Sequence, residues 1–228
     1  VDNILNRVES RDQGRDFQSQ FTMTIERNGG AKKRKFNWWA YREAGSDRSL
    51  IKYISPRSMR DSGLLIISES AKESNQWIYL SKAAKKEPRR VTAQDKGKPF
   101  MGSTYFYVDL ERFRTKNFQA KLLRKEKWQG YQVAVLELQP KSADYPYSKI
   151  ITRVDLNSFV PVQSDLYPRS GGKRVYQAEE LKKISGIWTI TKSSMKDPEG
   201  QSRLEVKSIK YNLGTKKSFF NLENLKLS

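Results

Sequence analysis

Hydrophobic and polar residues alternate along most of this chain. Within Phe17–Ile25, apolar side chains fall on odd-numbered positions, whereas glutamine and threonine occupy the even ones. A period of two places successive side chains on opposite faces of a strand, so the segment predicts a half-buried strand. Asn28-Gly29-Gly30 predicts a tight turn, and the alternation resumes at Phe36 and Trp38. Together these features predict a β-hairpin.

The same pattern predicts further strands, joined mainly by short turns. They cover residues 49–55, 64–69, 76–80, 117–128, 131–139, 148–156, 159–167, 173–185, 187–195, 202–213 and 219–225. About 11 of these strands are joined by hairpin turns, which indicates a single antiparallel sheet. A sheet of this size must curve to bury an apolar face. The expected fold is therefore mainly β, with one curved antiparallel sheet forming an unclosed β-barrel covered by short helices.

Two segments interrupt the strand pattern. Asp2 can cap a short helix over residues 2–9, in which Ile4, Leu5 and Val8 lie on one side. Residues 81–115 form a basic loop and a short helix between two sets of strands, and loops of this length are usually functional. No linker rich in proline, serine or glycine divides the chain, so residues 1–228 are expected to form a single domain.

The charge of the chain indicates an anionic partner. Lysine and arginine total 44 against 25 acidic residues, which gives a net charge of +19. Such a balance suits nucleic acid, an anionic lipid surface or an acidic protein. No stretch approaches the roughly 18 apolar residues that cross a bilayer, and the first residues lack the pattern of a signal peptide. We therefore expect a soluble protein whose export signal, if it had one, is absent from this sequence.

The residue types present exclude several kinds of chemistry. Without histidine or cysteine, the chain cannot form a Ser-His-Asp triad, a cysteine nucleophile, a disulfide or a usual zinc site. Its carboxylates show no diagnostic spacing. The Gly97–Ser103 segment lacks the lysine of a phosphate-binding loop. We expect no catalytic residue, metal or cofactor; an enzyme would need aspartate, glutamate, lysine or tyrosine as its acid or base.

Two groups of residues are candidates for binding. One group projects from the expected inner face and either packs as core or lines a ligand cavity. The other is a basic cluster in the 81–115 segment, expected to contact an anionic surface. The inner group is Phe21, Met23, Phe36, Trp38, Ile66, Trp77 and Met101, and the basic group is Lys82, Lys85, Lys86, Arg89 and Arg90.

Nucleic-acid binding is an alternative use of these features. The run Lys32-Lys33-Arg34-Lys35 could contact phosphates, while Trp38, Trp39, Trp77 and Tyr79 could stack on bases. Alternation nevertheless predicts that the Trp38 side of its strand is buried. Nucleic acid is therefore the less favoured partner.

An ordered series of short segments resembles the LolA-like outer-membrane lipoprotein-sorting proteins of the LolA/LolB superfamily. The resemblance spans most of the chain and centres on Phe100-Met101-Gly102-Ser103. The other segments are Arg48-Ser49-Leu50 with Ser55-Pro56, Trp77-Ile78-Tyr79-Leu80, Arg89-Arg90-Val91, Asp109-Leu110, Tyr147-Ser148-Lys149, Asp165-Leu166-Tyr167 and Gly186-Ile187-Trp188.

This resemblance implies an exported, periplasmic protein of a Gram-negative bacterium. It implies a carrier rather than an enzyme, with a hydrophobic cavity that binds lipid or lipoprotein acyl chains for transfer towards the outer membrane. The lipidated cysteine of LolB-type relatives is missing, which favours a freely soluble carrier. The resemblance also extends to proteins associated with inner-membrane transporters, so an accessory docking module of such a transporter is a further alternative.

Overall fold

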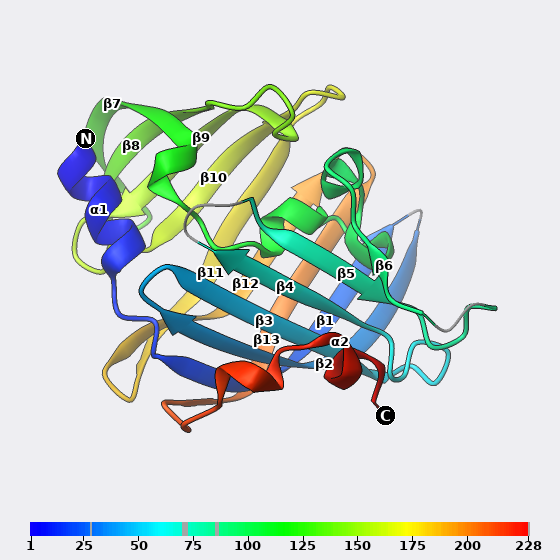
Figure 1. Cartoon of the computed structure of the whole chain (residues 1–228). Coiled ribbons are helices and arrows are strands. Elements are labelled where there is room, and N and C mark those ends of the chain that lie inside the picture. Colours follow the sequence, from blue (N-terminus) through cyan, green and yellow to red (C-terminus); the bar gives the residue numbers. More distant parts are fainter. Residues whose placement is uncertain (28, 70–72, 85–86, 228) are drawn as a thin grey trace. The chain divides into compact units, whose positions relative to one another are not determined.

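The computed structural model describes residues 1–27, 29–69, 73–84 and 87–227 (Figure 1). Over these residues the chain is mainly β and forms a single antiparallel sheet of 13 strands that does not close on itself. Its order is β6-β5-β4-β3-β2-β1-β13-β12-β11-β10-β9-β8-β7. Strands that follow one another in sequence therefore pair side by side almost throughout. The predicted fold class is confirmed.

The strands match the ranges expected from alternation, usually within two or three residues. Their bounds are β1 Asp16–Arg27, β2 Gly30–Glu43, β3 Ser46–Ser55, β4 Gly63–Glu69, β5 Asn75–Tyr79, β6 Arg89–Arg90, β7 Phe118–Trp128, β8 Tyr131–Pro140, β9 Tyr147–Asp155, β10 Pro161–Pro168, β11 Arg174–Ile184, β12 Ile187–Asp197 and β13 Gly200–Tyr211. In the first predicted turn Gly29 has a φ of 72°, which glycine adopts readily; Asn28 lies outside the described residues.

Helical segments are short. Helix α1 (Asp2–Ser10) agrees with the predicted helix to within one residue, and Leu5 and Val8 are its buried residues. The prediction that Asp2 caps it is wrong: Val1 occupies the N-cap position without a side-chain hydrogen bond, and Asp2 lies in the first turn. The segment between β6 and β7 contains four 3-10 turns: η1 (Gln94–Gly97), η2 (Phe100–Gly102), η3 (Tyr107–Leu110) and η4 (Thr115–Asn117). The short helix expected within residues 81–115 corresponds to η3.

The prediction of a final strand at residues 219–225 is wrong. This segment forms the 3-10 turn η5 (Lys217–Phe219) and helix α2 (Leu222–Lys226). The side chain of Asn221 caps α2 by accepting a hydrogen bond of 2.7 Å from the Asn224 backbone N–H, as expected for a helix N-cap. This local bond, together with packing of Phe220 and Leu225 against the sheet, favours helix over strand.

The chain divides into two compact units. Unit 1 contains residues 1–12, 25–30 and 93–203, and unit 2 contains residues 13–24, 31–92 and 204–228. The unit boundaries fall within β1 and β13 and after Gly30, the first residue of β2. That residues 1–228 fold as a single domain remains a prediction.

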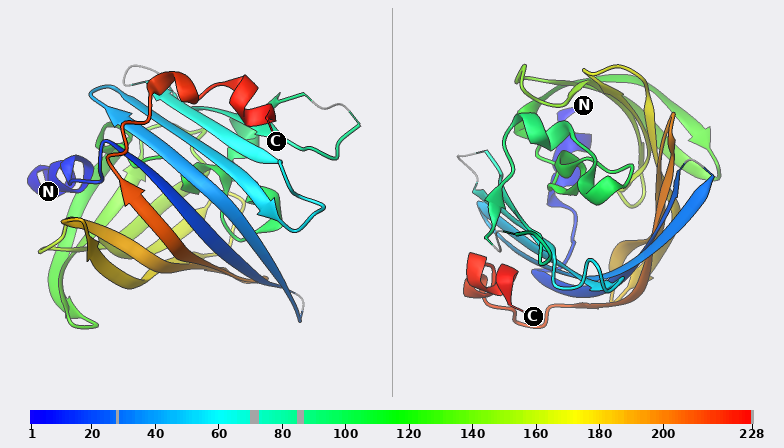
Figure 2. Two further views of the ribbon diagram at one scale, coloured as in Figure 1. Left: turned by 90° about the horizontal axis from the view of Figure 1, so that it is seen from below. Right: turned by 90° about the vertical axis from the view of Figure 1, so that its right-hand side faces the viewer.

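In unit 2, both faces of the sheet carry apolar side chains. Cross-strand pairs such as Phe36 with Tyr53 and Ile51 with Leu64 define one face, which we call face A. The pair Leu50 and Leu65 belongs to the opposite face, face B. Segments η5 and α2 lie on face B of strands β2–β5 (Figure 2), so the C-terminal residues bury apolar side chains that would otherwise face water.

Candidate functional site

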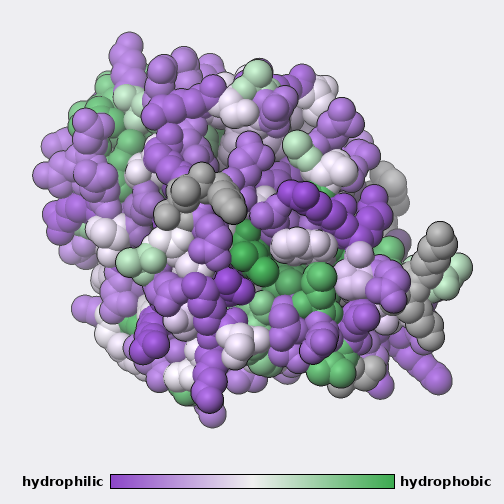
Figure 3. All heavy atoms as spheres, viewed as in Figure 1, coloured by the Kyte–Doolittle hydropathy of each residue, from purple (hydrophilic) through white to green (hydrophobic). Residues whose placement is uncertain are grey.

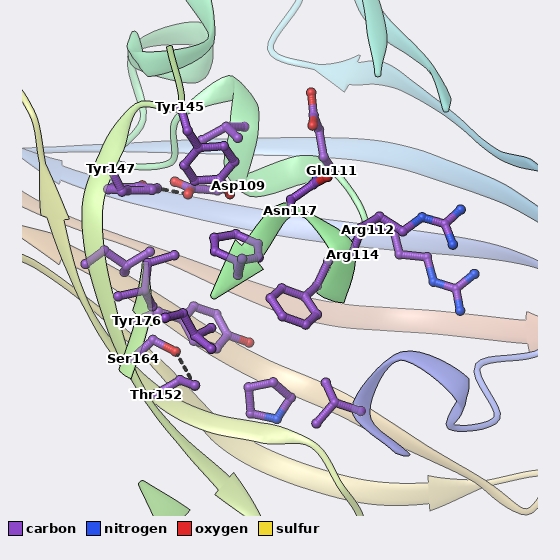
Figure 4. A pocket seen from close by; sticks show the side chains of 18 of the residues that line it. Asp109, Glu111, Arg112, Arg114, Asn117, Tyr145, Tyr147, Thr152, Ser164 and Tyr176 are labelled. Atoms are coloured by element: carbon purple, nitrogen blue, oxygen red, sulfur yellow. Dashed lines mark hydrogen bonds between the residues drawn. The ribbon is translucent and has the colours of Figure 1, made fainter. Parts of the chain in front are cut away.

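Unit 1 contains a cavity of about 250 Å³ (Figure 4). Strands β7–β12, the segment around η3 and helix α1 all contribute to its walls. Most of the lining side chains are aliphatic or aromatic. The lining residues are Leu5, Val8, Tyr105, Val108, Asp109, Glu111, Arg112, Phe113, Arg114, Asn117, Phe118, Leu138, Tyr145, Tyr147, Ile150, Thr152, Val154, Pro161, Ser164, Leu166, Tyr176 and Met195.

Strand register explains how residues far apart in sequence reach this cavity. Leu138 of β8 pairs with Ile150 of β9, and Ile150 in turn pairs with Leu166 of β10. Directly paired residues in an antiparallel sheet project from the same face. One row of aliphatic side chains therefore crosses three strands and forms an apolar wall.

The segment between η2 and η3 is fixed inside unit 1 by hydrogen bonds. Thr104 is fully buried; its hydroxyl donates to the Met195 carbonyl at 2.6 Å, and its backbone N–H donates to Ser202 Oγ at 2.9 Å. The Asp109 carboxylate accepts from the Phe106 backbone N–H at 2.7 Å and thereby caps η3. These bonds position the cavity-lining side chains of Tyr105, Val108 and Asp109.

Helix α1 closes another part of the wall. Leu5 and Val8 line the cavity, while Glu9 binds the chain just before β7. The Glu9 carboxylate accepts from the backbone N–H and hydroxyl of Thr115 at 2.9 and 2.6 Å, and from Arg114 Nη1 at 3.2 Å. Burial works to raise the pKa of Glu9, but these hydrogen bonds and the Arg114 charge outweigh it and lower the pKa.

At one end of the cavity, three polar side chains form a buried network. Tyr147 Oη donates to Asp109 Oδ1 at 2.6 Å, and Arg174 Nη1 donates to Asp109 Oδ2 at 3.0 Å. Arg174 Nη1 also donates to Tyr147 Oη. The Arg174 guanidinium stacks on Phe106, with Cζ 3.6 Å from the ring centroid. In Figure 4 the labelled residues Asp109, Tyr145 and Tyr147 lie close together.

The tyrosines around the cavity are uncharged hydroxyl donors at neutral pH. Burial raises the pKa of Tyr105, Tyr145 and Tyr147, and the negative charge of Asp109 raises it further in each case. Burial also raises the pKa of Tyr176, to about 12, against the opposing effect of its hydrogen bond with Ser193. Away from the Asp109 network, Ser164 Oγ donates to Thr152 Oγ1 at 2.8 Å. The cavity is thus mainly apolar, and its walls also contain hydroxyl groups and the charged side chains of Asp109, Glu111, Arg112 and Arg114.

The structure brings together part of the predicted inner group, in unit 2. The ring centroids of Phe21 and Phe36 are 5.5 Å apart, and those of Phe21 and Trp38 are 5.6 Å apart. Ile66 also belongs to face A, because it pairs with Ser49, which pairs with Ala40 on the Trp38 side of β2. Met23 is fully buried, and the alternation of β1 places it on the same side as Phe21.

Trp77 does not share this face, so the sequence grouping is wrong for that residue. It pairs with Leu65 and packs on face B against the cluster that contains Phe220 and Leu225. Met101 lies in η2 of unit 1, partly buried and with a φ of 51°. None of the seven predicted residues is among the described residues that line the unit 1 cavity, and ligand binding by this group remains a prediction.

The basic cluster is exposed where the structure describes it. Lys82 is exposed, and Arg89 and Arg90 form the short edge strand β6. Arg90 lies beside Trp77 in the register and donates to Asn75 Oδ1. Lys85 and Lys86 lie outside the described residues.

Sequence reasoning missed the cavity of unit 1. Its walls come from strands that the alternation did identify, but nothing local distinguishes a side chain that borders open space from one that packs against a neighbour. One signal was present: Asp109 and Tyr147 both fall in segments that carry the family resemblance. A polar residue in such a segment, within an otherwise apolar stretch, can indicate a buried network.

Two further features bear on function. The described residues contain no cluster of three or more acidic, histidine or cysteine side chains able to hold a metal ion. In that same part of the chain, no helix has the length and apolar character needed to span a membrane.

Comparison with known proteins relates the chain to one family and one fold. A family model described as "-like: Uncharacterized protein" matches residues 45–227. A candidate outer membrane lipoprotein-sorting protein domain from Vibrio parahaemolyticus has a TM-score of 0.92 at 24% identity, covering 99% of this chain and 97% of that one. No curated protein matches.

Two other solved structures are similar over nearly their full length. A DUF1329 family protein from Desulfovibrio piger has a TM-score of 0.91 at 22% identity, with 98% of this chain and 96% of that one covered. A LolA superfamily protein from Nitrosomonas europaea has a TM-score of 0.75 at 20% identity, with 98% of each chain covered.

Proposed function

The chain belongs to the family whose model matches residues 45–227 and has a LolA-like fold, and from this premise we propose that it is a lipid carrier. It binds acyl chains of lipids or lipoproteins in an apolar cavity and transfers them through the periplasm towards the outer membrane. It performs no catalysis and needs no cofactor. Its expected partners are the acyl cargo, an anionic membrane surface and an inner-membrane transporter.

The cavity of unit 1 is the observation that carries this proposal. Ile150, Val154, Leu166 and Met195 provide aliphatic surface on the strand side, and Leu5 of α1 provides it on the helix side. Moving one methylene from water into such surroundings contributes about 0.8 kcal/mol. Ten methylenes therefore contribute about 8 kcal/mol by the same rule, before the cost of ordering the chain.

The aromatic group Phe21, Phe36 and Trp38 is a second proposed acyl contact, within unit 2. Its rings lie on face A, where Met23 and Ile66 add aliphatic surface. The exposed cations Lys82, Arg89 and Arg90 are the proposed contact with anionic lipid head groups.

Lipid extraction combined with native mass spectrometry tests the carrier proposal. The protein is expressed with a periplasmic signal sequence, purified without detergent and weighed intact. A stoichiometric lipid adduct, identified after extraction, supports a carrier and defines its cargo. A clean apo mass, together with failure to take up added fatty acyl ligands, contradicts the proposal and favours a transporter-docking module.

Filling the cavity should abolish uptake. We predict that Ile150→Trp lowers acyl-ligand occupancy at least tenfold, because the larger side chain enters the cavity that Ile150 lines. The matched control is Ile151→Trp: Ile151 is the next residue of β9, and it packs on the opposite face against Val133 and Val135. Occupancy is measured by native mass spectrometry with decanoate esters as ligands. Equal occupancy in the two variants would show that the ligand binds elsewhere.

The packing of the aromatic residues disfavours nucleic-acid binding. Trp38 contacts the rings of Phe17 and Phe21, and Trp77 and Tyr79 pack with the C-terminal segment, so these rings are not free to stack on bases. A nucleic-acid-binding protein would show a steep loss of binding with salt and no extractable lipid. The same purified sample therefore distinguishes the two functions.

A further inference from the structure

Two buried hydroxyl groups lie within the apolar wall of the unit 1 cavity. Ile150, Thr152 and Val154 alternate along β9, so they share one face, and all three line the cavity. Across on β10, Ser164 is the direct partner of Thr152 and also lines the cavity. A hydrocarbon chain lying along β9 therefore meets apolar side chains on either side of these two hydroxyls.

The protons of both hydroxyls are already used. Ser164 Oγ donates to Thr152 Oγ1 at 2.8 Å, and Thr152 Oγ1 donates to the Gln163 carbonyl at 3.3 Å. Within the part of the chain that the structure describes, no group donates to Ser164 Oγ. Because a hydroxyl oxygen can accept as well as donate, Ser164 keeps acceptor capacity at the start of this chain of two hydrogen bonds.

The Ser164 oxygen is within reach of a ligand in the cavity. The residue retains 8% of its surface, and Leu166, two positions along β10 on the same face, is also a lining residue. In Figure 4 the side chains of Ser164 and Thr152, joined by their hydrogen bond, lie beside the ring of Tyr176. Because the serine side chain consists only of Cβ and Oγ, a ligand packed against it contacts the oxygen.

The direction of the two hydrogen bonds selects the ligand group. A ligand carbonyl would meet two oxygens that have no proton to offer, and a buried acceptor left without a donor weakens binding. A ligand hydroxyl can donate its proton to Ser164 Oγ. An amide N–H could donate as well, but it brings a carbonyl into the same apolar surroundings. This part of the wall therefore suits a hydroxyl with hydrocarbon on both sides.

We propose that the unit 1 cavity binds a hydrocarbon chain bearing a secondary hydroxyl along its length, and that this hydroxyl donates to Ser164 Oγ. The ligand class is a hydroxylated acyl chain, and the corresponding keto chain is discriminated against. This inference rests on the proposed carrier function and adds the chemical feature by which the cavity selects its cargo.

Competition among three kinds of ligand tests the proposal. Secondary decanols and the matching decanones have the same carbon chain, but only the alcohols can donate a hydrogen bond; methyl decanoate is the common reference. Since a chain without a head group can enter from either end, decan-2-ol to decan-5-ol place the hydroxyl at every interior carbon.

Each alcohol, its ketone and the reference are mixed in equal amounts with the intact chain. Free ligand is removed by rapid gel filtration, and the bound ligands are extracted and quantified by mass spectrometry. For at least one position of the hydroxyl, the wild-type protein should prefer the alcohol over the ketone about tenfold, the effect of one buried acceptor left without a donor. Ratios to the reference in the same sample do not depend on the folded fraction.

Two variants test the acceptor and the direction of the hydrogen bonds. Thr152→Val removes the oxygen that holds the Ser164 proton, so Ser164 can then donate to a ligand. Binding of the ketone should rise about tenfold, while binding of the alcohol stays unchanged. The double variant Thr152→Val with Ser164→Ala removes both oxygens, and binding of the alcohol should fall about tenfold.

The matched control is Ser194→Ala. Ser194 is a buried serine of β12 in the same unit. It is next in sequence to Met195, which lines the cavity, and therefore projects from the opposite face of the strand. This variant should retain the full preference for the alcohol.

Each outcome separates the two proposals. If the wild-type protein binds none of these ligands, the reference included, the carrier function fails. If it binds the reference but shows no preference for an alcohol at any of the four positions, the carrier function stands and the role of Ser164 is refuted. Three other results would also refute that role: a preference that persists in the double variant, unchanged ketone binding in Thr152→Val, or loss of the preference in Ser194→Ala.

Discussion

At the scale of single residues, Lys52 holds the C-terminal helix on face B of unit 2. Its Nζ atom donates to the carbonyl oxygens of Asp61, Leu225 and Leu227 at 2.9, 2.6 and 2.7 Å. Lysine can cap the orphan carbonyls at the end of a helix in this way. Gly63 leaves room for this arrangement, because a Cβ atom there would lie 2.3 Å from the Ile51 carbonyl oxygen and 3.2 Å from Leu225 Cδ1.

Burial lowers the pKa of Lys52, and the nearby charge of Asp61 offsets this effect in part. A lowered pKa in the folded state means that folding disfavours the charged form, so the penalty is fully present at neutral pH and disappears as pH rises towards 10.5. The three carbonyl contacts thus stabilise the position of α2 while the buried charge opposes folding.

We predict that Lys52→Met releases the C-terminal segment without unfolding the protein. The methionine keeps the apolar stem but removes the donors, so the Leu225 and Leu227 amides should exchange with solvent about tenfold faster, the loss expected for a charged hydrogen bond. Hydrogen exchange resolved by NMR measures the effect. Lys210→Met, at an exposed position in the same unit, is the control. Unchanged exchange in Lys52→Met would mean that apolar packing of Phe220 and Leu225 is sufficient.

At the scale of elements, the side chain and the backbone carbonyl of Glu9 both attach α1 to the rest of unit 1. Its carboxylate binds Thr115 and Arg114, and its backbone carbonyl accepts from Arg112 Nη2 at 2.7 Å. Arg7 adds a contact with Phe159, its Cζ 3.8 Å from the ring centroid. Polar contacts near the C-terminal end of the helix therefore keep Leu5 and Val8 in the cavity wall.

Acidification should loosen α1. The folded-state pKa of Glu9 lies below its ordinary value of 4.5, so its contribution is present above pH 4.5 and is lost as pH falls through the lowered pKa. Hydrogen exchange by mass spectrometry, corrected for intrinsic rates, should show this loss in peptides covering α1.

Substitution of Glu9 tests whether its carboxylate causes the loss of α1 protection at low pH. Glu9→Gln should reduce the hydrogen-exchange protection of α1 about tenfold at neutral pH, since one charged hydrogen-bond acceptor is lost. It should also abolish the further loss of protection that the wild-type protein shows on acidification. The control Asp2→Asn removes an exposed carboxylate from the same helix and should leave this further loss in place. If Glu9→Gln still shows the further loss, another carboxylate controls α1.

The two edge strands are protected in different ways. β6 contains two residues, whereas β7 runs over 11 residues with exposed Lys121, Lys125 and Lys127. A short edge and a lysine-rich edge both disfavour pairing with another chain. The two edges of this unclosed sheet are thereby shielded from aggregation.

At the scale of the whole molecule, the net charge of +19 dominates long-range interactions. Such a charge attracts the protein to anionic surfaces over distances comparable with the Debye length. On the face seen in Figure 3, apolar side chains gather over β3–β5. In unit 2, Trp39, Ile67, Trp77 and Phe219 are partly buried and pack against the cluster on face B. Arg90 pairs with Trp77 in this region, which places a cation beside an aromatic ring suited to a membrane interface.

We predict that replacing Lys82, Arg89 and Arg90 with glutamine weakens binding to anionic lipid vesicles about a hundredfold, because each cation contributes about 1 kcal/mol near a charged surface. The matched control replaces Lys121, Lys125 and Lys127, which removes the same charge from β7. Vesicle sedimentation at low and physiological salt measures both variants. Equal losses would show that net charge, and not this segment, determines binding.

The sequence by itself determined most of the strands and which of them become neighbours through short turns. The period of two is a local property, and turns such as Gln129-Gly130, where both residues have positive φ, specify which strands become neighbours. Net charge and the absence of histidine and cysteine are likewise independent of folding. For these reasons the fold class, the short helix α1 and the exclusion of several catalytic chemistries could be predicted from residues alone.

Tertiary structure decided which face each side chain uses and where open space remains. The run Leu64-Leu65-Ile66-Ile67 is apolar on both faces. Its pattern therefore does not show whether Trp77, which pairs with Leu65, lies on face A or face B. The residue pairs Arg174–Asp109 and Tyr147–Asp109 are 65 and 38 positions apart in sequence. They meet because strand register and the buried η3 segment position them together. A cavity is a property of packing among distant elements, and a local pattern contains no information about that packing.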